Sequence, residues 1–69
     1  MKKLNKLIQL CRDNNLNYEI GSDNQEHLSY VMIYKISEEE RQIFSYHSTS
    51  LKKAIKKALR YIKILSNGR

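Results

Sequence analysis

The sequence predicts an α+β fold in which a helix, three antiparallel strands and a second helix follow one another, α-β-β-β-α. Apolar residues recur at helical spacing near both ends of the chain, whereas the middle alternates between apolar and polar residues as strands do. Short polar segments separate the strands and favour hairpins, hence an antiparallel sheet. We expect one small domain, residues 1–69, with a three-stranded antiparallel sheet and two helices on one face of it.

The first helix is predicted over residues 3–14. One buried stripe follows from four residues at the spacing i, i+3, i+4 and i+7: Leu4, Leu7, Ile8 and Cys11. A thiol on that stripe is expected to be an inert core residue. The run Asp13-Asn14-Asn15 should end the helix, because these side chains compete for backbone hydrogen bonds and Asn tolerates a left-handed cap.

Three strands are predicted between the helices, over residues 16–20, 28–36 and 41–46. The first alternates apolar and polar residues, and the second is rich in tyrosine and β-branched residues. A polar loop, residues 21–26, separates the first two strands, and a turn at residues 37–40 separates the second from the third.

Strand alternation divides the sheet residues into two sets, and helices packed on one side can cover only one set. We expect the aromatic set to form the core because it is larger and more continuous: Tyr30, Met32, Tyr34, Ile36, Phe44 and Tyr46. The other set, with Val31, Ile33 and Ile43, should then face outward. The alternative leaves the tyrosines on an open face, which would indicate base stacking or a self-association surface.

The last helix is predicted over residues 51–65, with candidate N-caps at residues 48–50 and Gly68 just past its end. Its apolar residues share one side, and six basic residues share the other: Lys52, Lys53, Lys56, Lys57, Arg60 and Lys63. With Arg69, the segment after Ser50 holds seven basic residues and no acidic one, whereas the first 49 residues hold six basic and seven acidic residues, so the +6 charge of the chain comes from this segment. Ordinary solvated helix faces mix charges to form ion pairs. The pattern therefore favours a partner of negative charge over a merely solvated face.

Composition disfavours several other functions. We expect no enzyme, cofactor or metal site. His27 and His47 lack metal-ligand spacing, and the adjacent residues Glu38-Glu39-Glu40 point apart in a turn. The run Ser48-Thr49-Ser50 beside His47 lacks an orienting acid. No membrane association is expected, since no apolar run is long enough to span a bilayer and the core needs the apolar side of the last helix. The unpaired cysteine and the absence of a signal sequence favour a cytoplasmic protein. A domain this small is a candidate for homodimerisation.

The order of elements and several residues resemble a double-stranded-RNA-binding domain over nearly the whole chain. That family carries a histidine in the first loop between strands and a Ser-Lys-Lys-x-Ala-Lys signature at the start of the last helix. His27 lies in the matching loop, and four residues resemble the signature: Ser50, Lys52, Lys53 and Lys56. The sequence departs from the family where Leu51 follows the serine, where Ala54 follows Lys53 directly, and where Gln25-Glu26 replaces a Gly-Pro.

The resemblance implies that the lysines opening the last helix contact phosphates across the major groove of duplex RNA, while His27 approaches the neighbouring minor groove. Asn5 and Gln9 are the polar candidates on the first helix. We therefore expect a small non-catalytic module that binds nucleic acid, duplex RNA above all, through the six basic residues of the last helix and His27. The alternative is a homodimeric adaptor or inhibitor, phage-like in size, whose lysine helix meets an acidic protein surface.

Overall fold

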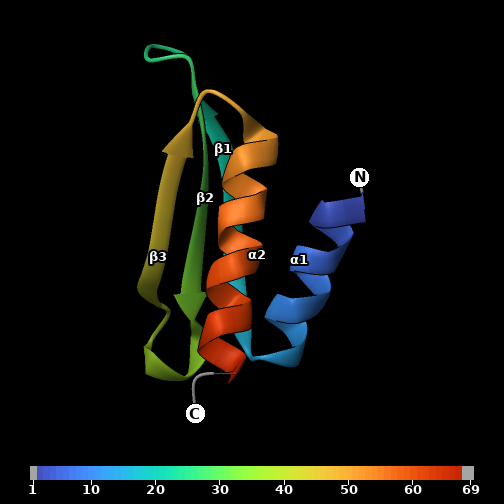
Figure 1. Ribbon diagram of the computed structural model, residues 1–69. Coiled ribbons are helices and arrows are strands. Elements are labelled where there is room, and N and C mark those ends of the chain that lie inside the picture. The colour runs from blue at the N-terminus through green and yellow to red at the C-terminus, as the bar shows by residue number, and fades with distance from the viewer. Residues whose placement is uncertain (1, 68–69) are drawn as a thin grey trace.

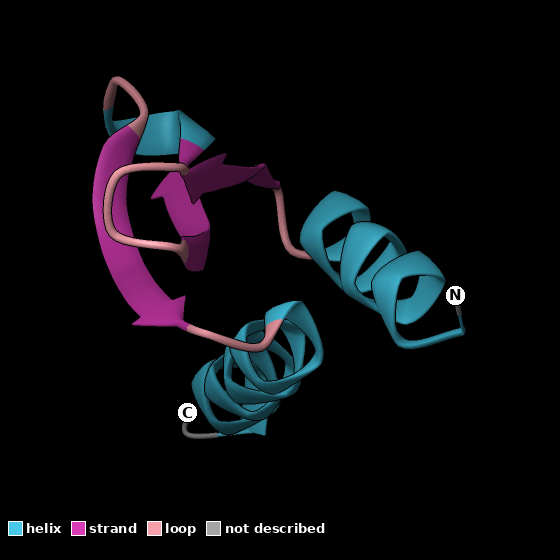
Figure 2. Cartoon of the chain, turned by 90° about the horizontal axis from the view of Figure 1, so that it is seen from above, coloured by secondary structure: helices cyan, strands magenta, loops and turns pink. Residues whose placement is uncertain are grey.

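The computed structural model describes residues 2–67 and has the predicted α-β-β-β-α order (Figure 1). Helix α1 spans Lys2–Asp13 and helix α2 spans Leu51–Asn67. Strands β1 (Leu16–Asp23), β2 (Leu28–Lys35) and β3 (Arg41–Ser48) form one antiparallel sheet in the order β1-β2-β3. Both helices lie on the same side of this sheet, α1 against β1 and α2 against β2 and β3 (Figure 2).

The end of α1 is as predicted. Asn15 adopts the left-handed conformation with φ of 58°, and the backbone N–H of Asn14 donates to the carbonyl of Leu10 at 3.1 Å. The Asn14 side chain donates to the same carbonyl at 2.8 Å. The two asparagines therefore satisfy the open end of the helix and turn the chain into β1.

The first loop between strands is shorter than predicted. Residues 21–23 extend β1, where Asp23 pairs with Leu28, so their assignment to the loop was wrong. The Asp23 carboxylate accepts the backbone N–H groups of Gln25 at 3.0 Å and Glu26 at 3.3 Å, which closes a tight turn. Strand β2 ends one residue early, because Ile36–Glu38 form a short 3-10 helix. Helix α2 continues to Asn67, and the predicted stop at Gly68 lies outside the described residues.

The core corrects the predicted assignment of the sheet faces. Val31 and Ile33, expected to face outward, are fully buried beneath the helices, at 0% exposure. They share that core with buried residues of both helices: Leu7, Cys11, Ala54, Ile55, Ala58 and Ile62. Tyr30, Met32 and Tyr34 alternate with them along β2 and therefore lie on the open face. Their assignment to the core was wrong.

A β-bulge in β3 accounts for the error. Phe44 and Tyr46 pack against the core as predicted, but they pair with Ile33 and Val31 rather than with the tyrosines of β2. The register shifts between Ile33 and Tyr34, so Ile43 becomes an extra residue that also packs against the core. If the alternation of side chains is counted without the bulge, Phe44 and Tyr46 are placed on the same face as the tyrosines of β2. The one extra residue moves every later side chain of β3 to the other face.

Candidate nucleic-acid interface

The start of α2 is fixed by Ser50, one of the three predicted caps. The Ser50 hydroxyl accepts the backbone N–H of Lys53 at 3.4 Å, and the Ser50 carbonyl accepts the N–H of Ala54 at 3.2 Å. The hydroxyl of Ser48 in turn accepts the N–H of Ser50 at 3.1 Å. These bonds place Lys52 and Lys53 in the first helical turn, where no acidic residue accompanies them.

The structure brings together the six basic residues predicted on the last helix. All six are exposed: Lys52, Lys53, Lys56, Lys57, Arg60 and Lys63. Within residues 2–67, both ion pairs belong to Glu38, which lies 3.1 Å from Lys35 and 3.4 Å from Arg41. No carboxylate of the described chain therefore neutralises the cations of α2. They remain available to an external anion.

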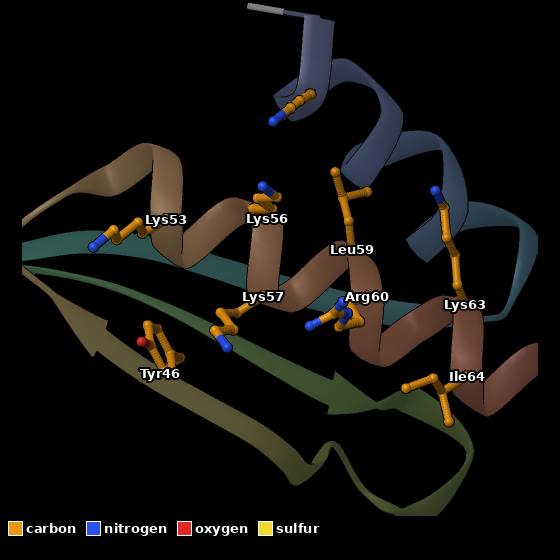
Figure 3. A pocket seen from close by; sticks show the side chains of 9 residues that line it. Tyr46, Lys53, Lys56, Lys57, Leu59, Arg60, Lys63 and Ile64 are labelled. Carbon is orange, nitrogen blue, oxygen red and sulfur yellow. The ribbon is translucent and has the colours of Figure 1, made fainter.

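These cations form two rows along α2 (Figure 3). Lys53, Lys57 and Arg60 follow the flank that faces β3, and we call them the β3 row. Lys56 and Lys63 follow the flank that faces α1, and helical spacing adds Lys52 to them; we call these three the α1 row. Residues of both rows, together with Tyr46 of β3 and Lys3 of α1, line a shallow groove of about 820 Å³.

Helix α1 contributes to this surface, which sequence reasoning missed. Four basic residues are exposed on α1: Lys2, Lys3, Lys6 and Arg12. The only acidic residue of α1 is Asp13, whose carboxylate accepts the side-chain amide of Gln9 at 3.0 Å. Of the polar candidates on α1, Gln9 is thus engaged locally and Asn5 is exposed. The excess of lysine in the sequence of α1 could have indicated this contribution. The position of these lysines beside α2, however, depends on how the two helices pack.

His27 lies apart from the two rows. It is exposed, has a left-handed backbone with φ of 55°, and ends the loop between β1 and β2. That loop lies at the end of the molecule where α2 begins, above the strands (Figure 1). Its imidazole is not among the residues that line the groove. The backbone conformation gives His27 a structural role, since His accepts the left-handed region more readily than most residues.

The acidic residues gather on the strands and their connections. Glu38, Glu39 and Glu40 lie between β2 and β3, at the end of the molecule where α2 finishes (Figure 1). The pKa of Glu38 is lowered, first by its hydrogen bond to Lys35 and then by the charge of Arg41. An anionic ligand is repelled from this end, and Asp23 and Glu26 at the β1–β2 turn repel it from the end where α2 begins. The acidic residues therefore favour neither half of α2 over the other.

No family model, curated protein or solved structure matches the chain. Within residues 2–67, no helix is both long enough and apolar enough to cross a membrane. The same residues bring together no group of three His, Cys, Asp or Glu side chains suited to a metal ion. The function therefore has to be inferred from the chemistry of the surfaces.

Proposed function

We propose that the protein binds nucleic acid, with duplex RNA as the preferred ligand, through the two basic rows of α2. The observation that carries this proposal is the exposure of six cations on one helix with no carboxylate paired to them. Each cation that meets a phosphate releases a condensed counterion, which favours binding. A solvated helix face gains nothing from such an arrangement, because like charges at adjacent turns repel one another.

The geometry of the two rows supports a duplex as the ligand. From Lys52 to Lys63 the helix rises about 16 Å, and its diameter with side chains is about 10–12 Å. The rows lie side by side on the exposed face of α2 and line one groove, so the helix can place cations against phosphates of two closely spaced strands at once. The major groove of A-form RNA is narrow, which brings its two bordering strands close together. The resemblance of Ser50, Lys52, Lys53 and Lys56 to the RNA-binding signature points to the same ligand.

Electrophoretic mobility shifts with RNA duplex, DNA duplex and single strands at two salt concentrations test this proposal. We expect the RNA duplex to bind most tightly. With about three to five phosphates neutralised, log K should fall against log salt with a slope of about −3 to −5. Equal affinity for both duplexes would contradict the choice of RNA, and absence of binding to all three would contradict the proposed function.

A charge-reversal variant tests the site. Changing Lys52, Lys53 and Lys56 to Glu should abolish binding and leave the circular dichroism unchanged, since all three are exposed and acidic residues suit the first turn of a helix. A matched control changes Arg12, Lys35 and Arg41 to Glu and alters the net charge equally. We expect the control to bind far more tightly than the α2 variant. Equal losses would mean that overall charge, rather than α2, governs binding.

The open face of the sheet supports a second candidate function, that of a protein-interaction module. Tyr30, Met32 and Tyr34 are half-buried on a face that no helix covers. In this reading the lysines of α2 meet an acidic protein surface, or the open face meets a second copy. Sedimentation of the protein as a dimer, together with no shift of any nucleic acid, would favour this function over the first.

A further inference from the structure

The open face carries an ordered group of side chains that nucleic-acid binding by α2 does not use. It consists of Glu19 and Gly21 on β1, Tyr30, Met32 and Tyr34 on β2, and His47 on β3, and we call it the tyrosine platform. The register of the sheet brings these residues together. Met32 pairs with Glu19, and Tyr30 lies between Gly21 on one side and His47 on the other.

Glu19 is the centre of the tyrosine platform. The Tyr30 hydroxyl donates to Oε2 of Glu19 at 3.1 Å. The Tyr34 hydroxyl lies 3.4 Å from Oε1 of Glu19 and 3.3 Å from Sδ of Met32, so its one proton is shared between these two acceptors. The carboxylate of Glu19 is therefore held mainly by Tyr30, with a weaker contact from Tyr34. Each carboxylate oxygen has further lone pairs, so Glu19, which is exposed, can still accept bonds from a ligand.

Gly21 allows the Tyr30 ring to lie against the sheet. A Cβ at Gly21 would come within 2.6 Å of Cζ of Tyr30 and closer still to its hydroxyl oxygen. The ring therefore occupies the space above the β1 backbone that any other residue would fill. On its other side, the Tyr30 ring centroid is 5.5 Å from that of His47, with the planes tilted by 32°. The result is a broad aromatic surface beside a carboxylate that accepts a hydrogen bond from Tyr30.

The charge of this face is opposite to that of the helices. By the register of the strands, its outward positions include Glu19 and Asp23 and no lysine or arginine. A second copy docked face to face would bring the same carboxylates toward each other, which costs free energy. A cationic group is instead attracted by the aromatic rings and by the carboxylates of this face. Aromatic faces attract cations, and carboxylates form charge-assisted hydrogen bonds with them.

We propose that the tyrosine platform binds an arginine side chain presented by a basic segment of a partner protein. The guanidinium would stack on the tyrosine rings and donate to Glu19, since its planar fork suits both interactions. The aliphatic part of the arginine would contact the flexible thioether of Met32. This site lies on the opposite side of the sheet from α2, so it is separate from the proposed nucleic-acid surface.

Amide shifts in NMR spectra during titration with a capped Gly-Arg-Gly-Arg-Gly peptide test the proposal. We expect shifts centred on Glu19, Tyr30 and Tyr34. A peptide with citrulline in place of arginine has nearly the same shape without the charge, and it should give no saturable shift. Absence of saturable shifts with the arginine peptide, or equal shifts with both peptides, would overturn the proposal.

Glu19→Gln separates a specific site from general attraction. The variant keeps an oxygen acceptor at an exposed position, so the fold should persist, yet affinity for the arginine peptide should fall about tenfold. Glu26→Gln removes an exposed carboxylate from the neighbouring loop and should have little effect. Equal losses in both variants would overturn the site. A sedimenting dimer that Glu19→Gln strengthens would assign the face to a second copy instead.

Discussion

At the scale of single residues, Gly21 decides what the open face can present. Sequence reasoning placed it in a loop, because glycine commonly marks turns. The structure places it inside β1, opposite Tyr30, where its missing side chain admits the tyrosine ring. Glycine within a strand also marks the close approach of another group. Which group approaches is decided by the pairing of β1 with β2, and a single strand's sequence does not contain that information.

The pKa of Tyr30 depends on this arrangement. Its pKa is raised above the ordinary 10.0, first by the hydrogen bond to Glu19 and then by the charge of that carboxylate. The folded state thus holds this proton more tightly than the unfolded state. The contribution of protonated Tyr30 to folding stability is complete below the ordinary pKa of tyrosine and is lost as pH rises through the raised pKa.

Gly21→Ala should therefore lower the pKa of Tyr30 toward its ordinary value, because the new Cβ displaces the ring from Glu19. The cost in stability should be small, since the ring is half-exposed and can move, and alanine reduces the entropy of the unfolded chain. Phenolate absorbance during alkaline titration measures the change, and Tyr30→Phe identifies the affected group. An unaltered titration would contradict the proposed position of the ring.

At the scale of elements, α2 was predicted most completely from the sequence. Its apolar side and its six cations follow from helical periodicity, and its cap, Ser50, is one of the three candidates that the sequence offered. The sequence did not reveal that Lys3 of α1 joins the same groove, because that depends on how the two helices pack. Strand β3 was predicted less well, since a bulge at Ile43 is invisible to simple alternation.

The two rows of α2 can be tested separately. One variant changes the β3 row, Lys53, Lys57 and Arg60, to Gln, and the other changes the α1 row, Lys52, Lys56 and Lys63, to Gln. Each should weaken binding of duplex RNA and make the salt slope shallower by about 1–2, because the three to five expected phosphate contacts are divided between the two rows. Salt-dependent fluorescence anisotropy measures both slopes. A loss confined to one row would mean that α2 meets the phosphates along a single flank.

At the scale of the whole molecule, charge is separated between the helices and the sheet. The two helices hold ten of the 13 basic residues and one acidic residue, Asp13. The strands and their connections hold the other six acidic residues: Glu19, Asp23, Glu26, Glu38, Glu39 and Glu40. Partners of opposite charge can therefore approach opposite sides of one small domain. Each could be bound without displacing the other.

The sequence predicted the order of elements and the common side of the helices, but not the covered face of the sheet. Both faces of β2 are apolar, so hydrophobicity alone does not choose between them. The choice follows from shape. Ala54 and Ala58 are fully buried, which lets α2 approach the sheet closely, and the remaining space is filled by Val31 and Ile33. Tyrosines in that space would force the helix away.

A pair of neighbouring substitutions tests this assignment in the intact protein. Val31→Lys places a charge at a site of 0% exposure in a core whose described residues include no buried polar or charged group. An unpaired buried charge costs several kcal/mol, and small domains have little stability to lose. We therefore expect circular dichroism and NMR spectra of an unfolded chain.

Met32→Lys makes the same chemical change one residue later, on the open face. The ammonium can reach solvent and lies opposite Glu19, so the fold should persist. This variant should still bind duplex RNA through α2, yet it should lose the arginine peptide, because its own cation occupies the tyrosine platform. A folded Val31→Lys beside an unfolded Met32→Lys would reverse the two faces. The tyrosines would then belong to the core, and no aromatic platform would remain to receive a partner.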